Sequence, residues 1–379
     1  MLPKKAKLFF QRWRKKADQF VPKKISTTAE WFAQNRDIAR YTEVVPEATG
    51  CFPKEVQLTH PIFQVEEWQK PGFTIPASFV IDLPNARLIR KFGTLTTHDG
   101  VLLGDISRTD LWFKPEHPIM EETELPPARW LRGTYLAIPS YYVCTYHWLI
   151  DLLPRIKLVE MAGYRLSDFD GFLIRKPKYQ AHVDALPMAG IPLEKVKWTT
   201  HNFHFQCDRV VAPSFTNNTR ESHAFIFPYL RHQFVPRDFK RPTPARRIYI
   251  SRKDAPFTRR GIVNEQELFP ILEAEGFEIV TMSDLPFEEQ VRLFASADTF
   301  VCPHGGALGN LVFCEAPTRV MEIFTPSYNP TFMRSLCRQL GFEYYAIVGE
   351  EIPNPRYRQE SIRIDPDFFR AELKKFLAM

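Results

Sequence analysis

A cluster of glycines marks the part of the chain best suited to hold an anion. Three of the chain's 16 glycines fall within the segment FVCPHGGALGN, residues 300–310, after a β-rich run and before a short helical one. Glycine lets the backbone approach a ligand, and the exposed amides and dipole of a helix start hold phosphate oxygens. The segment therefore predicts a phosphate site; the alternative is a tight turn that only packs the helix on the strand. The glycines expected at the site are Gly305, Gly306 and Gly309.

A basic loop is expected to meet the same anion. Arg252, Lys253, Arg259 and Arg260 follow the run RRIYIS, which predicts a buried strand. In a parallel sheet such a loop and the glycine segment lie at one edge, beyond the carboxyl ends of the strands. Guanidinium groups and backbone amides together can stabilise a departing diphosphate without a metal ion. The alternative is a solvated basic loop.

A single acid interrupts the apolar run VMEIF at Glu322. A buried carboxylate is unfavourable unless it is paired. Glu322 is therefore either satisfied by protein groups or accepts hydrogen bonds from ligand hydroxyls such as those of a ribose, and we favour the ribose.

A polar stripe runs along the segment YHWLIDLLPRIKLVE. On a helix, His147, Asp151 and Arg155 are four residues apart and share one face, opposite a face of leucines, Ile156 and Val159. Either His147 or Asp151 could accept a proton from an acceptor hydroxyl if the stripe faces a cleft. The alternative is a surface stripe with an ion pair.

A metal site is not expected. Asp168-Phe169-Asp170 is a DxD pattern, which some metal-dependent glycosyltransferases use, but it precedes a predicted strand instead of following one. The six cysteines form neither a CxxC pair nor any metal-like spacing. They indicate free thiols in a reducing compartment, and we predict no cofactor.

The elements that position these residues alternate in the C-terminal half. Asn264 followed by Glu267 is typical of a capping box at a helix start, and Gly276 of a helix end. The strands expected are 247–251, 277–282, 299–302, 319–324 and 343–348, and further helices are expected at 286–297, 306–313 and 331–340. Strands alternating with helices predict an α/β class and a parallel sheet covered on both faces.

The N-terminal half combines two patterns. Short β-like runs in 80–112 surround a His98-Asp99-Gly100 turn and predict hairpins, whereas 145–213 returns to helix and strand alternation. Its expected helix is 145–161, and its expected strands are 171–174, 195–198 and 209–212. A proline- and charge-rich stretch, residues 235–246, places a domain boundary near residue 240.

The first 24 residues are strongly basic. They hold nine Lys or Arg and one Asp, a net charge of +8 against +6 for the whole chain. Apolar residues recur every three or four positions, which predicts a basic amphipathic helix that can lie on an anionic membrane or pack on the protein itself. No signal peptide and no membrane span are visible, and the body of the chain is not basic enough to indicate nucleic-acid binding.

These blocks together resemble glycosyltransferase family 61. The resemblance rests on YHWLIDLLPR, on RRIYISR through RGIVNEQEL, on VCPHGGALGN and on VMEIFTP, in order over roughly residues 80 to 348. It implies a GT-B-like fold, two Rossmann-like domains facing a central cleft, and an inverting, metal-independent transfer, commonly from a UDP-sugar. It also implies that Arg252 and Arg260 face the diphosphate and that Glu322 meets the ribose.

The expected function is therefore transfer of a sugar from a nucleotide sugar to a hydroxyl of a glycan or lipid-linked glycan. The alternative is a non-catalytic nucleotide- or carbohydrate-binding protein. The division expected is a basic segment at 1–45, an acceptor-side α/β domain at 46–239 and a donor-binding domain at 240–379, in a cytoplasmic protein that is peripheral on the inner membrane face. The expected donor-binding residues are Arg252, Arg260, Asn264, His304, Gly305, Gly306, Ala307, Asn310 and Glu322, and the expected catalytic residues are Asp151 and His147.

Overall fold

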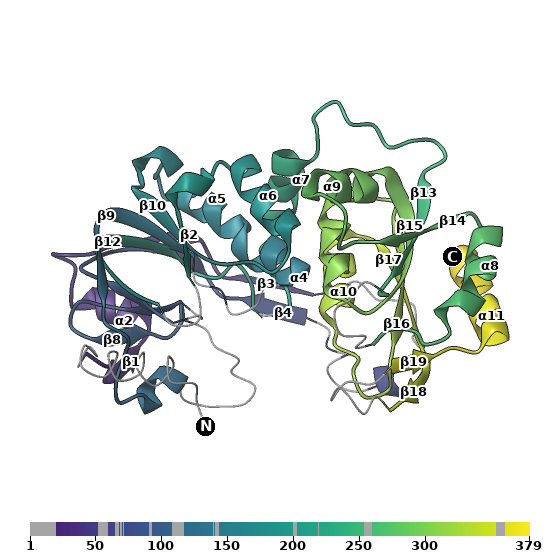
Figure 1. Cartoon of the computed structure of the whole chain (residues 1–379), viewed down its shortest axis with the longest axis horizontal. Coiled ribbons are helices and arrows are strands. Elements are labelled where there is room, and N and C mark those ends of the chain that lie inside the picture. Colours follow the sequence, from purple (N-terminus) through teal and green to yellow (C-terminus); the bar gives the residue numbers. More distant parts are fainter. Residues whose placement is uncertain are drawn as a thin grey trace, which may run out of the picture.

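The computed structural model has two α/β bodies side by side (Figure 1). It describes residues 20–51, 60–64, 68, 70, 72–90, 93–107, 117–138, 140, 144–199, 203–218, 220–253, 260–353 and 361–379. Residues 1–19, where most of the basic segment lies, fall outside this description. No helix within it has the length and apolar character needed to cross a membrane.

The N-terminal body is built on a mixed ten-stranded sheet. The order is β1-β8-β7-β6-β12-β9-β10-β11, with β5 beside β12 and β2 beside β5. Strands β9 to β12 run parallel, and β2, β5, β6 and β7 pair antiparallel with their neighbours. The strands are β1 (Lys24–Ser26), β2 (Arg40–Val45), β5 (Ser78–Pro84), β6 (Arg87–Ile89), β7 (Thr94–Thr96), β8 (Val101–Leu103), β9 (Arg129–Ile138), β10 (Gly171–Arg175), β11 (Val196–Thr199) and β12 (His204–Pro213).

The hairpin expected around His98-Asp99-Gly100 is confirmed between β7 and β8. Gly100 has φ +85°, a conformation that favours glycine, and its amide closes the turn on the carbonyl of Thr97 at 3.1 Å. A second pair, β3 (Ala48–Cys51) and β4 (Gly72–Ile75), forms a separate two-stranded sheet. The N-terminal sheet therefore includes hairpins that a purely parallel, doubly wound sheet lacks.

Helices cover one face of the parallel part of this sheet. They join β9 to β10, β10 to β11, and β12 to the second body, while α2 packs Trp31 into the core on the opposite face. The helical elements are α2 (Thr28–Ala33), η1 (Pro61–Phe63), η2 (Pro118–Glu121), α4 (Thr145–His147), the π-helix η3 (Trp148–Leu152), α5 (Pro154–Met161), η4 (Leu166–Asp168), α6 (Gln180–Met188), η5 (Leu193–Lys195) and α7 (Ile226–Phe234).

The C-terminal body is a five-stranded parallel sheet, as the sequence predicts. Its order is β14-β13-β15-β16-β17, so the chain leaves β13 to one side and then returns to add the remaining strands on the other. The strands are β13 (Arg246–Ser251), β14 (Phe277–Thr281), β15 (Ala297–Pro303), β16 (Arg319–Phe324) and β17 (Glu343–Val348). In this topology ligands bind where the order reverses, between the carboxyl ends of β13 and β15.

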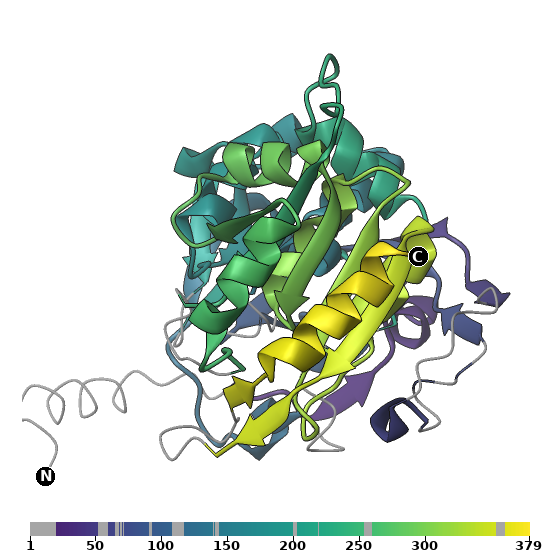
Figure 2. The ribbon, with the colours of Figure 1, turned by 90° about the vertical axis from the view of Figure 1, so that its right-hand side faces the viewer.

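Two helical layers cover this sheet. Helices α8 (Glu265–Ala274) and α11 (Pro366–Leu377) lie side by side on the outer face (Figure 2). The inner face, toward the N-terminal body, carries α9 (Phe287–Ser296), the 3₁₀-helix η6 (Gly306–Phe313) and α10 (Phe332–Leu340). A short hairpin of β18 (Glu350–Ile352) and β19 (Ser361–Arg363) precedes α11.

One continuous apolar core joins the two bodies. It runs from the helix-covered face of the N-terminal sheet through α4 to α7 into η6, α9 and the inner face of the C-terminal sheet. Residues from the N-terminal half also cross over: Phe63 and Trp68 pack on Phe324 at the end of β16, with ring centroids 6.1 and 5.7 Å away. The bodies are therefore packed together by apolar side chains and not only joined by the linker.

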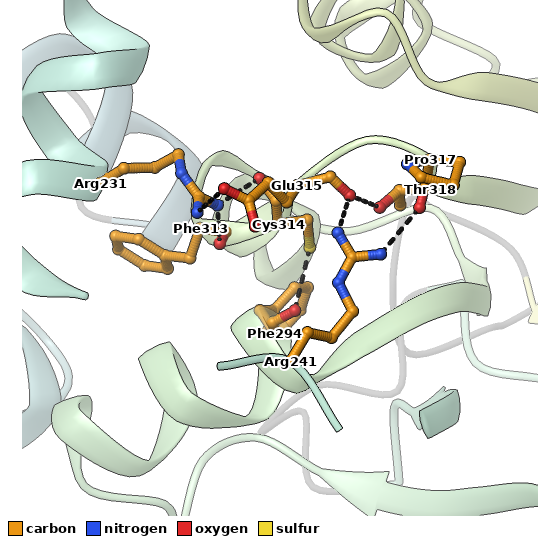
Figure 3. A network of polar contacts seen from close by, with 8 residues as sticks. All are labelled: Arg231, Arg241, Phe294, Phe313, Cys314, Glu315, Pro317 and Thr318. Atoms are coloured by element: carbon orange, nitrogen blue, oxygen red, sulfur yellow. Dashed lines mark hydrogen bonds and ion pairs between the residues drawn. The ribbon is translucent and has the colours of Figure 1, made fainter. Parts of the chain in front are cut away.

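Arginines fix the ends of helices at the amino edge of the C-terminal sheet. Arg231 of α7 donates from Nη1 to the carbonyls of Phe313 and Cys314, both at 2.5 Å, where η6 ends (Figure 3). Arg241 of the linker donates to the carbonyls of Glu315 and Pro317 just beyond. These cations meet the negative end of the helix dipole, so the glycine helix is anchored at the end opposite its glycines.

Candidate active site

The topological switch point is occupied by residues of the two predicted donor loops. Arg252 follows β13 directly, and its Nη1 donates to the carbonyl of His304, at the end of β15, over 3.1 Å. A Cβ added to Gly305 would lie 1.9 Å from the same Nη1. The glycine is therefore required for the guanidinium to lie across the turn, and this places a fixed positive charge at the switch point.

Arg260 supplies a second cation in an unfavourable setting. It has φ +62°, a left-handed conformation that costs a non-glycine residue about 1–2 kcal/mol. Its guanidinium lies 4.6 Å from the ring centroid of Tyr328, and burial lowers its pKa from the ordinary value. Within the described part of the chain no carboxylate forms an ion pair with it. A strained, desolvated arginine of this kind is stabilised when an anion arrives.

His304 and Glu322 form a buried pair beneath these arginines. Glu322 has no exposed surface, and its two oxygens contact Nδ1 of His304 and the hydroxyl of Tyr344, both at 2.5 Å. Burial lowers the pKa of His304, because desolvation and the nearby arginines outweigh the attraction of Glu322. Protein groups thus satisfy the carboxylate, which is the first of the two alternatives that the sequence left open for this acid. Glu322 orients His304 at the glycine turn.

The glycine helix also packs against the N-terminal body. A Cβ on Gly309 would lie 2.7 Å from Cα of Tyr146, and one on Gly306 would lie 3.2 Å from Cβ of Cys144. Helix η6 can therefore approach the start of α4 only with glycines at these positions. These glycines do have a packing role, as one alternative for them predicts. They allow η6 of the C-terminal body to pack against α4 of the N-terminal body, which brings the glycine turn next to the YHWLID block.

The YHWLID block contains a π-helix that aligns His147 with Asp151. Pro154 has no amide hydrogen to donate to the carbonyl of Ile150, and its ring clashes with a regular turn there. The helix widens, and the amide of Leu153 bonds the carbonyl of Trp148 five residues back at 3.1 Å. Nδ1 of His147 then contacts Oδ2 of Asp151, and both side chains stay partly exposed, at 17% and 18%.

A loop from β12 completes this pair. Nδ2 of Asn217 donates to Oδ1 of Asp151 at 2.5 Å, and Asn217 itself is buried. Burial raises the pKa of the Cys144 thiol, which is close enough to interact with both Asp151 and Arg260. The two charged groups are therefore both near Cys144, so the structure brings Asp151 and Arg260 into one region.

Arg155 does not belong to the polar stripe predicted for this helix. It is fully buried, it donates from Nε to the carbonyl of Pro213 at 3.1 Å, and it lies over the ring of Phe215. The prediction assumed a regular helix with 3.6 residues per turn. The π-helix shifts the register after Asp151 and turns Arg155 away from the site.

Asn264 is not the capping-box residue that the sequence predicts. Its side chain makes no cap with the start of α8; it donates to the carbonyl of Ile364 at 2.7 Å and accepts from the amide of Ile364 at 3.1 Å. It joins α8 to the segment before α11, a partner that is distant in sequence. Asn310 is likewise fully buried and donates to the carbonyl of Ala307 at 3.0 Å, within the glycine helix.

Several residues of the site escaped sequence reasoning. Asn217 and Tyr328 lie in loops of the chain without a recognisable pattern, and Cys144 was considered only as a thiol. The sequence marks these residues only by their position, because each lies shortly before a helix or after a strand that ends near the site. The two acids of the DxD pattern lie away from this site, at the amino end of β10. There Asp168 pairs with Arg165, and Asp170 accepts a hydrogen bond from the amide of Thr134.

The fold and site define an α/β protein with two fixed guanidinium groups and a glycine helix at the switch point of a parallel sheet. Residues 145–321 match the family model described as Glycosyltransferase 61, which includes the YHWLID block, both arginines, the glycine turn and the start of β16. The match confirms the resemblance to glycosyltransferase family 61 found in the sequence and supports glycosyltransferase activity in general. No curated protein matches the chain.

Proposed function

We propose that the protein transfers a sugar from a nucleotide sugar, a UDP-sugar, to a hydroxyl of a glycan or a lipid-linked glycan, with inversion and without a metal ion. The observation that carries this proposal is Arg260, a strained and desolvated guanidinium beside the glycine turn that no carboxylate of the described chain pairs with. A diphosphate supplies the missing anion. The two bodies then act in a GT-B-like manner, with the donor on the C-terminal body and the acceptor on the N-terminal body.

The diphosphate would lie between Arg252, Arg260 and the amides that begin η6. Both guanidinium groups are held before the ligand arrives, Arg252 by the carbonyl of His304 and Arg260 by Tyr328. Donors fixed in advance stabilise the charge that develops on the leaving group without reorganising during the reaction. Ala307 and Asn310 belong to this helix and stabilise it. The ribose of the donor would lie beside His304, on the side where His304 contacts Glu322.

Proton removal from the acceptor falls to the His147 and Asp151 pair. The pair is partly exposed, whereas the other acids near the site are buried. The acceptor oxygen attacks the anomeric carbon from the side opposite the diphosphate, and the configuration inverts. Holding acceptor and donor in this geometry removes much of the entropic part of the barrier.

Residues 1–24 are proposed to hold the protein on the anionic inner face of a membrane, near a lipid-linked acceptor. Their sequence supports this through its charge and its apolar repeat. Deleting them should abolish binding to vesicles of anionic lipid, measured by flotation, and leave hydrolysis of the donor unchanged. Binding that survives the deletion rules out this anchor.

A screen for slow hydrolysis of nucleotide sugars tests the central proposal without knowledge of the acceptor. Release of a nucleoside diphosphate should occur with one donor class, should persist in EDTA, and should fall by about 100-fold or more in Arg252→Ala. Arg246→Ala is the matched control, because Arg246 begins the same strand but pairs with Glu278 at the surface. If a nucleotide binds but no donor is ever turned over, the protein is a binding protein and not a transferase.

A further inference from the structure

The loop after β12 makes a third contribution to the catalytic pair. Three successive contacts tie this loop to the helix that carries the pair. Arg155 donates to the carbonyl of Pro213, Thr216 Oγ1 donates to the carbonyl of Ile150 at 3.4 Å, and Asn217 Nδ2 donates to Asp151 Oδ1 at 2.5 Å. The last two contacts thus fall on neighbouring residues of the π-helix, Ile150 and Asp151.

The π-helix makes these contacts available. Pro154 leaves the carbonyl of Ile150 without its usual helical donor, and the hydroxyl of Thr216 takes that place. With Thr216 held there, Asn217 is directed at the next residue, Asp151. The amide of Asn217 is 5% exposed, so water competes little for the bond.

We infer that Asn217 is a positioning residue that makes His147, and not Asp151, the group that accepts the proton. Its amide hydrogen can only donate, so Oδ1 of Asp151 is the acceptor of this bond. The other oxygen, Oδ2, contacts Nδ1 of His147. With both oxygens engaged, Asp151 holds the proton of the imidazole on Nδ1, and Nε2 is the basic nitrogen.

This inference rests on the proposed transfer reaction and divides its steps among the three residues. The acceptor hydroxyl gives its proton to Nε2 of His147 while its oxygen forms a bond to the anomeric carbon. The bond from that carbon to the diphosphate oxygen breaks, and the electron pair leaves with the nucleoside diphosphate. Asp151 stabilises the imidazolium that forms, and Asn217 keeps Asp151 in place.

Kinetics of Asn217→Ala test this role. Turnover should fall about 10- to 100-fold, as expected for losing one hydrogen bond to a charged group, while the affinity for the nucleoside diphosphate is unchanged. Gln233→Ala is the control, since it removes another side-chain amide bond of the same body, to the carbonyl of Met188 at 2.6 Å.

The tautomer of His147 tests the same role without an activity assay. In the wild-type protein, nitrogen NMR of labelled histidine should show neutral His147 with its proton on Nδ1. In Asn217→Ala and Asp151→Asn a substantial part should carry the proton on Nε2. Unchanged turnover and tautomer in a folded Asn217→Ala protein overturn the inference, whereas the absence of turnover in the wild-type protein with every donor overturns the proposed function alone.

Discussion

Arg260 offers the most direct test of how the site is built, because its environment predicts a large effect on ligand binding and little effect on stability. In Arg260→Ala a nucleoside diphosphate loses one charge-assisted contact, which is worth about 1.5–3 kcal/mol. At about 1.4 kcal/mol for each factor of ten, the dissociation constant should rise about 10- to 150-fold. Isothermal titration with UDP measures this change without turnover.

The same substitution should change the stability of the ligand-free protein very little. The side chain's stacking on Tyr328 contributes about 1–2 kcal/mol. Its loss is offset because the protein no longer desolvates a charge that forms no ion pair with a carboxylate of the described chain. The free energy of unfolding in urea should therefore change by less than about 1 kcal/mol. By contrast, removing a buried arginine that has an ion-pair partner usually destabilises the protein, because the partner's charge is left buried and unpaired.

A second variant at this position separates backbone strain from charge. Arg260→Gly also removes the guanidinium, but glycine adopts φ +62° without cost. Its free energy of unfolding in urea should therefore be about 1 kcal/mol higher than that of Arg260→Ala. Both variants should bind UDP equally weakly. Wild-type affinity in either variant, or a loss of several kcal/mol of stability in Arg260→Ala, would refute the view of Arg260 as a cation that awaits a diphosphate.

Further predictions concern how the bodies and the glycine helix are held. Gly309→Ala should lower the free energy of unfolding in urea by about 1–3 kcal/mol, because its Cβ would lie 2.7 Å from backbone of Tyr146. Gly306→Ala should cost less, because its closest neighbour is the Cys144 side chain at 3.2 Å; equal effects would contradict this packing. Arg231→Ala should cost about 1–3 kcal/mol, since the carbonyls of Phe313 and Cys314 lose their donor, and a neutral result would show that water replaces it. Burial lowers the pKa of His182 to about 4, so the unfolded state binds more protons between pH 6.5 and 4, and stability should fall as pH drops through that range by up to about 1.4 kcal/mol per unit. His182→Phe, which keeps a ring against Trp148, should flatten this slope, and urea titrations at pH 4.5 and 6.5 would detect an unchanged slope.

The C-terminal body could be predicted almost entirely from sequence. Its strands and helices are short apolar runs separated by glycine, proline or capping residues, and such local signals require no knowledge of distant partners. The expected strands at 247–251, 319–324 and 343–348 coincide with β13, β16 and β17 to within a residue. Because parallel strands place their carboxyl ends at one edge, the pattern alone also brought Arg252, Arg260 and the glycine turn together.

The N-terminal body was less predictable, because its sheet depends on pairings between distant segments. Strand β12 pairs with β9 on one side and with both β5 and β6 on the other, and no local pattern specifies these partners. The membrane contact of residues 1–24 and the domain division remain predictions. The GT-B-like arrangement is likewise a proposal that rests on the family.

What the residues determined by themselves was their chemistry: an anion site at the glycines, a histidine and an acid that share a helix face, and a family. Only the tertiary structure decided their roles. Pro154 changed the helix register and removed Arg155 from the stripe, Tyr344 satisfied the acid expected to meet a ribose, and Asn217, in the loop after β12, bonds Asp151. The physical reason is common to all three, since hydrogen-bond satisfaction of a buried group depends on which distant segment folding places beside it.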